Sequence, residues 1–377
     1  AKIVDDLSAI KQSCNFGIEC GKYTGTYHQW YLPVKISFHF MASKLSPKLS
    51  TYKVHRCLSR AHLVEKFKLF PHQTKAKQRY LLDFDVATQI ASKLNVSESL
   101  VYECNPGAGV LTRALLNHGA KKVVGLEHNW KFLPHLHELE HESDGRFKAE
   151  YADIGKLDVA GPGIPPAISS HKLLAGVNRV PWSEERLIAK LVGIEKEKTA
   201  PANLINLLLH MLRCSGFFSY GRIEVALLFT DDRARRLLAQ PGDLMYNRLA
   251  ILAWMLCDVK LLHVESNLSF DPLPSAGYSN PPPQMHLISL VPKRDFKLQV
   301  PPYCILLVPK FLKLLTMKTS RPLSGAIESI SPGSSVLLKE LGLPKNVKPL
   351  ELTPSQYKLL FEMFFNREDS MLDFLME

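Results

Sequence analysis

The sequence lacks an apolar run of the about 18 residues that a membrane-crossing helix needs, and segments such as 204–212 fall well short of it. Its seven cysteines form no CxxC pair, so neither a zinc site nor a disulfide framework is indicated. Four histidines without recognised ligand spacing are expected on the surface: His128, His135, His137 and His141. We therefore predict a soluble protein from a reducing compartment, with no metal ion and no membrane partner.

Acidic residues are scarce at the N-terminus. Residues 1–80 hold fourteen Lys and Arg against four Asp and Glu, which accounts for most of the formal net charge of +11. From Met41, basic residues mix with Ser, Thr and spaced apolar residues, a composition typical of a mitochondrial transit peptide. A basic arm that binds nucleic acid directly is the alternative. We predict a basic leader over 1–70 that includes a transit peptide, and a location in the mitochondrial matrix, at the nucleoid.

Beyond the leader, strand and helix patterns alternate along the chain. The expected strands lie within 100–109, 121–129, 146–158, 186–194, 221–229 and 285–293. The expected helices lie within 80–95, 110–119, 130–142, 202–216 and 231–242. Such alternation predicts an α/β fold, a doubly wound, Rossmann-like parallel sheet covered by helices on both faces, over 71–294. Short amphipathic patterns after Arg294 predict a smaller helical C-terminal domain over 295–377.

A glycine-containing turn, "NPGAG" at 105–109, follows the first expected strand. Gly107 and Gly109 allow close backbone approach to a ligand, although they can equally serve only a tight turn. Glu127 ends the next strand at the spacing from which a carboxylate reaches both ribose hydroxyls, and Asp153 ends the third, where it can accept from an adenine amino group. The turn lacks GxGxxG spacing and a P-loop lysine, so a cofactor without phosphate, S-adenosylmethionine, is predicted.

At these residues the chain resembles the ribosomal RNA adenine dimethyltransferases and the mitochondrial transcription factors B related to them. "QRYLLD" at 78–83 is similar to the family's QNFLxD motif, and "ECNPGAGVLT" at 103–112 to its ExGPGxGxLT motif. The resemblance implies an S-adenosylmethionine-dependent methyltransferase domain. The cofactor-binding residues that it implies are Leu81, Asn105, Pro106, Gly107, Gly109, Glu127 and Asp153.

The catalytic motif of that family departs from its pattern here. Active members carry NLPY or NIPY after the fourth strand, where Asn accepts the adenine amino group and Tyr stacks on the flipped base. This chain reads "VGIEKE", with Ile194 at the Asn position and Glu197 at the aromatic position. Losing one preorganised polar group costs roughly 10²- to 10³-fold in rate. "GVNRVPW", with Asn178, Pro181 and Trp182, is an alternative displaced motif, although it precedes the fourth strand.

Basic clusters elsewhere suggest a surface that contacts nucleic-acid backbone. The predicted nucleic-acid-binding residues are Lys293, Arg294, Lys310, Lys313, Lys318 and Arg321. Arg233, Arg235 and Arg236 form a further group, and a solvated helical face is the alternative for each cluster.

The resemblance implies a mitochondrial transcription initiation factor that binds the single-subunit mitochondrial RNA polymerase and helps to melt promoter DNA. The alternative hypothesis is a ribosomal RNA N6,N6-dimethyltransferase that acts on two adjacent adenines of small-subunit rRNA. A small-molecule methyltransferase is disfavoured by the basic charge and by the C-terminal domain. Because the catalytic motif is degenerate, we expect weak or absent methyl transfer.

Overall fold

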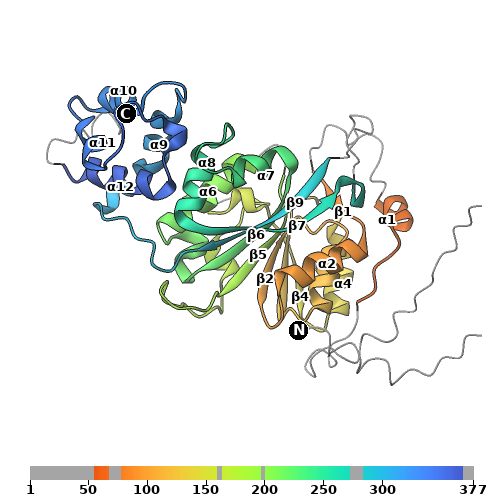
Figure 1. Cartoon of the computed structure of the whole chain (residues 1–377). Helices are drawn as coiled ribbons and strands as arrows, with labels where there is room; N and C mark the ends of the chain where they lie inside the picture. The colour runs from red at the N-terminus through yellow and green to blue at the C-terminus, as the bar shows by residue number, and fades with distance from the viewer. Residues whose placement is uncertain (1–54, 68–77, 159–163, 197–199, 272–282, 368–377) are drawn as a thin grey trace, which may run out of the picture. The chain divides into compact units, whose positions relative to one another are not determined.

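The computed structural model describes residues 55–67, 78–158, 164–196, 200–271 and 283–367 (Figure 1). A seven-stranded sheet lies at its centre, in the order β4-β3-β2-β5-β6-β9-β7. The strands are β2 (Leu100–Cys104), β3 (Lys122–Glu127), β4 (Phe147–Tyr151), β5 (Ala189–Ile194), β6 (Ile223–Thr230), β7 (Cys257–Ser266) and β9 (Gln284–Pro292). No helix in these ranges is long and apolar enough to span a membrane.

The five strands from β4 to β6 are parallel, as predicted, and β9 and β7 extend the sheet in antiparallel pairing. Among the described strands of this sheet, only β9 runs against the others, because the edge strand β7 has the same direction as β6. Helix α8 (Arg248–Leu256) runs directly into β7 at Cys257. No Gly or Pro separates these two elements, and β7 is absent from the expected strands. The predicted α/β doubly wound fold is confirmed, with a mixed rather than all-parallel sheet.

Helices cover both faces of the sheet, and the side chains of each strand alternate between two hydrophobic clusters. Val101 faces one cluster, while its neighbour Tyr102 faces the other. Helices α2 (Phe84–Leu94), α3 (Val110–Asn117) and α4 (Leu133–Glu142) contribute to the first cluster. Helices α6 (Ala200–Leu212), α7 (Asp231–Leu238) and α8 contribute to the second. The short helix α5 (Ser170–Leu173) interrupts the expected loop.

The chain after β9 is helical, as expected. Its helices are α9 (Val308–Thr316), α10 (Leu323–Ile330), α11 (Val336–Glu340) and α12 (Pro354–Phe365). The Phe311 ring of α9 lies 5.3 Å from the rings of Phe361 and Phe364 in α12, measured between centroids. Helix α8 contacts both α9 and α12, so the second cluster continues into the C-terminal helices. The boundaries 1–70, 71–294 and 295–377 stay predictions.

Most of the expected leader lies outside the described residues, but 55–67 can be placed. Helix α1 (Arg60–Phe67) buries Leu63, and Arg60 forms an ion pair with Asp271 at 3.0 Å. The Phe67 ring lies 5.0 Å from that of Phe132, which precedes α4. These contacts attach this part of the chain to the helix layer of the first cluster.

Candidate cofactor and nucleic-acid site

The turn after β2 has the backbone conformation that its glycines permit. Asn105, Gly107 and Gly109 all adopt left-handed conformations, with φ of 56°, 57° and 72°. Gly109 is the N-cap of α3, and its amide donates to the Pro106 carbonyl at 2.9 Å. The N-terminus of α3 therefore begins directly at the turn, at the carboxyl edge of the parallel strands, where ligands bind in open α/β sheets.

Glu127 holds this turn from the next strand. Its Oε2 accepts the Gly107 amide at 2.9 Å, and its Oε1 accepts the Asn129 amide at 2.7 Å. The side chain is fully buried, and this burial raises its pKa to about 7 although the backbone hydrogen bonds oppose the shift. Glu127 thus stands at the predicted ribose position, with both oxygens accepting backbone amides.

Asn105 links the turn to the end of β5. Its Nδ2 donates to the Ile194 carbonyl at 3.0 Å, and its Oδ1 lies 3.1 Å from the His128 Nδ1. The predicted cofactor turn and the degenerate catalytic segment are therefore joined by a side-chain hydrogen bond. This contact uses the backbone of Ile194 and does not depend on the side chain at that position.

The first motif, "QRYLLD", covers the turn from the other side. Tyr80 and Leu81 form β1 (Tyr80–Leu81), which pairs with β8 (Phe270–Asp271), and both side chains are buried. A Cβ placed on Gly107 would lie 2.5 Å from Tyr80 Cδ1. The ring of Tyr80 thus explains why this turn position has no side chain.

Asp153 follows β4 and is partly exposed, and its carboxylate already has two partners. Its Oδ1 accepts the Gly155 amide at 2.9 Å, and its Oδ2 accepts Lys196 Nζ at 2.6 Å. Burial would raise the pKa of Asp153, but the hydrogen bond and the charge of Lys196 outweigh it and hold that pKa below its usual value. Sequence reasoning missed Lys196, although it lies in "VGIEKE", two residues after the Asn position.

The set of groups at this edge fits the nucleoside part of S-adenosylmethionine. Glu127 ends β3 and Asp153 follows β4, and the turn after β2 lets the backbone approach a ligand closely. Carboxylates at these positions can accept hydrogen bonds from ribose hydroxyls and from an adenine amino group. An adjoining cavity of about 20 Å³, roughly one water molecule, has a lining that includes Asn105, Glu195 and Lys196. A bound nucleoside therefore has to share or displace the present partners of Glu127 and Asp153.

The degenerate segment begins at the end of β5, where the resemblance places the catalytic motif. Ile194 is buried, and its side chain offers no hydrogen-bond acceptor. Glu197 lies outside the described residues. Between them, Glu195 is largely buried, and this burial raises its pKa to about 8 despite the charge of Arg233. The raised pKa favours the neutral form of Glu195.

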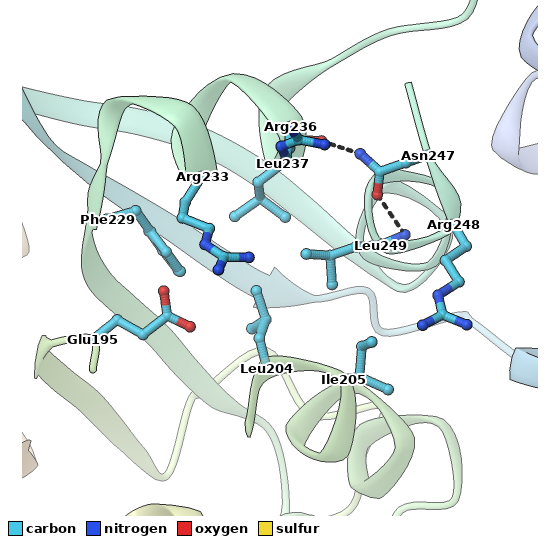
Figure 2. Close-up of a pocket in the computed structure, with 10 residues that line it drawn as sticks. All are labelled: Glu195, Leu204, Ile205, Phe229, Arg233, Arg236, Leu237, Asn247, Arg248 and Leu249. Carbon is cyan, nitrogen blue, oxygen red and sulfur yellow. Dashed lines mark hydrogen bonds between the residues drawn. The ribbon is translucent and has the colours of Figure 1, made fainter. Parts of the chain in front are cut away.

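Glu195 also lines a pocket of about 220 Å³ that lies beyond β5 and β6. Figure 2 shows its carboxyl group pointing toward the Arg233 guanidinium, with Leu204 and Phe229 beside them. The side chains of Arg236 and Arg248 line the same pocket. The hollow combines apolar walls with guanidinium groups, a combination that suits a base and its phosphate.

The arginines of α7 are partly engaged in ion pairs along their own helix. Arg235 pairs with Asp231 at 2.8 Å, and Arg236 pairs with Asp232 at 3.1 Å, both at i,i+4 spacing. Such exposed pairs contribute little to stability, so the guanidinium groups stay available to an anionic ligand.

The predicted nucleic-acid residues fall into two groups. Lys293 is half-buried and donates from Nζ to the carbonyls of Trp254 and Met255, where it caps α8, while Arg294 beside it is exposed. Both follow β9, whose end lies at the amino edge of the parallel strands, away from the cofactor turn. The other four lie on α9 and the turn after it, where Lys310 is half-buried and Lys313, Lys318 and Arg321 are exposed.

"GVNRVPW" also lies at the amino edge. The Val180 amide donates to the Tyr220 carbonyl just before β6 begins, and Trp182 Nε1 donates to the Lys293 carbonyl at 3.0 Å. The Trp182 ring lies 6.5 Å from that of Phe218. The segment is therefore at the opposite end of the strands from Asp153, and Trp182 packs a loop against the core.

The expectation of surface histidines is wrong for His135. It is buried between α4 and the turn, with Nε2 3.2 Å from the Ala108 carbonyl and Nδ1 3.2 Å from Glu138 Oε2. Position 135 lies on the inner face of α4, next to Leu136, and the imidazole finds polar partners there. Among the described residues no group of three His, Cys, Asp or Glu side chains is placed to hold a metal ion.

Comparison with known proteins gives a consistent result. The family model described as ribosomal RNA adenine dimethylase matches residues 70–348. The chain is 30% identical over 313 residues to "Dimethyladenosine transferase 2, mitochondrial" of Homo sapiens, which covers 78% of each chain, and 31% identical to that of Bos taurus, with the same coverage. Among solved structures, a dimethyladenosine transferase from Plasmodium falciparum aligns with TM-score 0.54 and 16% identity, over 76% of this chain and 97% of that one. The 23S rRNA methyltransferase ErmE aligns with TM-score 0.51 and 15% identity, over 76% of this chain and all of that one.

Proposed function

The chain belongs to the ribosomal RNA adenine dimethylase family, and on that premise we propose that it is a mitochondrial transcription initiation factor. In this role it assists the single-subunit mitochondrial RNA polymerase in melting promoter DNA and holds the separated strand. The mitochondrial label of its relatives supports a mitochondrial location, and we place it in the matrix, at the nucleoid.

One observation carries the proposal: the position where the family accepts its target adenine has no acceptor side chain. Ile194 ends β5 with a buried aliphatic side chain, and Glu195 and Lys196 follow in place of the Leu-Pro pair. The proposal is also supported by Glu127, which accepts the Gly107 amide, and by Asp153, which binds Lys196 of this segment. The pattern fits a protein that keeps the fold and an S-adenosylmethionine pocket while methyl transfer is weak or lost.

Two surfaces supply the contacts that a separated strand needs. The pocket of Figure 2 offers Arg233, Arg236 and Arg248 around apolar walls. Lys313, Lys318 and Arg321 are exposed on α9 and the turn after it. Cations bind the phosphate backbone, and apolar walls accept an unstacked base without reading its sequence.

The test is run-off transcription with the polymerase, on a linear duplex promoter and on the same template melted in advance around the start site. We expect the chain to be required on the duplex and nearly dispensable on the melted template, because its contribution is strand separation. Equal amounts of run-off transcript from the duplex with and without the chain would contradict the proposal. Reversing the charges of Lys318 and Arg321 should lower duplex transcription, whereas the same reversal at exposed Lys345 is the matched control.

A ribosomal RNA N6,N6-dimethyltransferase is the second candidate, supported by the relatives' printed names and by Glu127 and Asp153 at the ends of β3 and β4. Its substrate would be two adjacent adenines of mitochondrial small-subunit rRNA. Transfer of radiolabelled methyl groups to that hairpin by the purified chain would favour this candidate over the first.

A further inference from the structure

The cofactor edge holds a lysine that the family's motifs do not explain. Lys196 stands where NLPY has its proline, and Lys196 Nζ lies 2.6 Å from Asp153 Oδ2. Each side chain of this pair is 15% exposed, so water competes with the contact only weakly. The pair joins the loop after β5 to the loop after β4, across the turn that follows β2.

Asp153 is the acid predicted to accept a hydrogen bond from the adenine amino group. Its Oδ1 accepts the Gly155 amide at 2.9 Å, and Lys196 binds the other oxygen. A hydrogen bond from either donor to the ionised carboxylate is charge-assisted, but only Lys196 also carries a positive charge, which adds a Coulomb attraction to Asp153. An adenine amino group, which is a neutral donor, is therefore the weaker of the two competitors for the same carboxylate oxygen.

We propose that Lys196 sets the affinity of the cofactor site: it is an internal competitor that occupies one carboxylate oxygen of Asp153, the acid proposed to bind adenine, and it weakens binding of every adenosine ligand. The inference rests on the proposed cofactor pocket. Lys196 acts on the part that S-adenosylmethionine shares with S-adenosylhomocysteine, the adenine, and leaves the ribose contact at Glu127 untouched. The site thus keeps the family's acids but presents one of them already paired.

The experiment is calorimetric titration of the full chain with S-adenosylmethionine and, separately, with S-adenosylhomocysteine. Lys196→Met keeps the length of the side chain and removes its charge and its donors. We expect both ligands to bind about 10-fold more tightly, which is the value of one hydrogen bond to a charged group. Lys156→Met, at an exposed lysine three residues after Asp153, is the matched control and should leave both affinities unchanged.

A second variant closes a double-mutant cycle. Asp153→Asn removes the acid for which Lys196 competes, so Lys196→Met should give little further gain in that background. A full 10-fold gain in the absence of the acid would overturn competition at Asp153. A gain for cationic S-adenosylmethionine alone would overturn it as well, because that result indicates repulsion between charges rather than occupation of a shared oxygen.

The remaining outcomes separate this inference from the proposed function. Equal affinities of wild type and Lys196→Met, with measurable binding in both, overturn the role of Lys196 and leave the cofactor pocket standing. Weaker binding in Lys196→Met also overturns it, since Lys196 then orients Asp153 for the ligand. If neither protein binds either ligand, while Lys196→Met unfolds at the same urea concentration as wild type, the pocket and the inference fail together.

Discussion

The two loops that meet at the carboxyl edge of the sheet differ in how they are held. The turn at 105–109 is fixed by a buried acid, Glu127, whose two oxygens accept the backbone amides of Gly107 and Asn129. The loop that begins at Ile194 is fixed through its backbone carbonyl and through Lys196, and neither contact requires the family's catalytic side chains. The predicted cofactor turn, 105–109, is called the binding loop, and it depends on the side chain of Glu127. The degenerate segment 194–197 is called the catalytic loop, and the contacts of Ile194 and Lys196 do not require the family's catalytic residues.

The largest effect is expected when the family's catalytic motif is restored in the catalytic loop. Changing 194–197 from Ile-Glu-Lys-Glu to Asn-Leu-Pro-Tyr should raise methyl transfer to small-subunit rRNA by roughly 10²-fold or more, the value of a restored preorganised polar group. Radiolabelled transfer to the hairpin measures it. Adding Glu127→Ala to the restored chain should abolish the gain, and a restored chain as inactive as wild type would show that the loss lies elsewhere.

Breaking the binding loop should have the next largest effect. Glu127→Ala leaves the amides of Gly107 and Asn129 without their acceptor and removes the proposed ribose contact. We expect S-adenosylmethionine to bind about 100-fold more weakly, since two hydrogen bonds to a charged group are lost. Calorimetry compares it with Glu65→Ala, at an exposed glutamate of α1. Unchanged affinity in Glu127→Ala would remove Glu127 from the cofactor site.

A buried acid beneath the turn gives a pH-dependent prediction. Glu103 is buried in β2, and burial raises its pKa to about 8, against an opposing hydrogen bond from Thr112 at 2.6 Å. Because the folded state binds this proton more tightly than the unfolded chain, its contribution to stability is full below about pH 4.5 and is lost as pH rises toward 8. Wild type should therefore lose stability between pH 6 and pH 8, whereas Glu103→Gln has no such group to titrate. We expect the difference in unfolding free energy between the two proteins to shift in favour of Glu103→Gln by on the order of 2 kcal/mol over this range. Urea unfolding at the two pH values measures this, and parallel losses in both proteins would contradict it.

The smallest expected effect tests how closely Tyr80 packs against the turn at Gly107. Gly107→Ala combines a φ of +57° with a Cβ placed 2.5 Å from Tyr80, whereas Gly176→Ala has a φ of +79° and nothing within 4 Å. Both variants carry the strain of a left-handed residue, and only the first collides with a ring. We expect Gly107→Ala to cost about 1 kcal/mol more in the free energy of unfolding. Equal losses in urea unfolding would mean that Tyr80 moves away at no cost.

The sequence predicted the parallel half of the fold because its signals are local. The caps of α2 show this: Asp83 accepts two amides at the N-terminus, and Asn95 ends the helix in a left-handed conformation. Strand β7 escaped prediction because the apolar helix pattern of 248–256 continues into Cys257 and Val259 without a Gly or Pro, which obscures their alternation with Asp258 and Lys260. A local pattern without a boundary residue does not show where the helix ends and the strand begins.

Some residues of the candidate site were predicted from local patterns in the sequence, and others were not. Glu127 and Asp153 were placed by their spacing along successive strands, and the structure brings both to one edge. Lys196 was missed because its partner lies 43 residues away, and Lys293 was read as a surface cation although it caps α8. A charged residue's role depends on which carbonyl or carboxylate folding brings to it, and composition does not carry that information.

The most direct test of the central claim is made on a single sample of the purified chain. It is titrated calorimetrically with S-adenosylmethionine, and the small-subunit rRNA hairpin is then added and radiolabelled methyl transfer is followed. A retained binding loop beside a lost catalytic loop predicts measurable binding with no turnover above background. Turnover would contradict the loss of catalysis at Ile194, and absence of binding would contradict the retained pocket at Glu127 and Asp153.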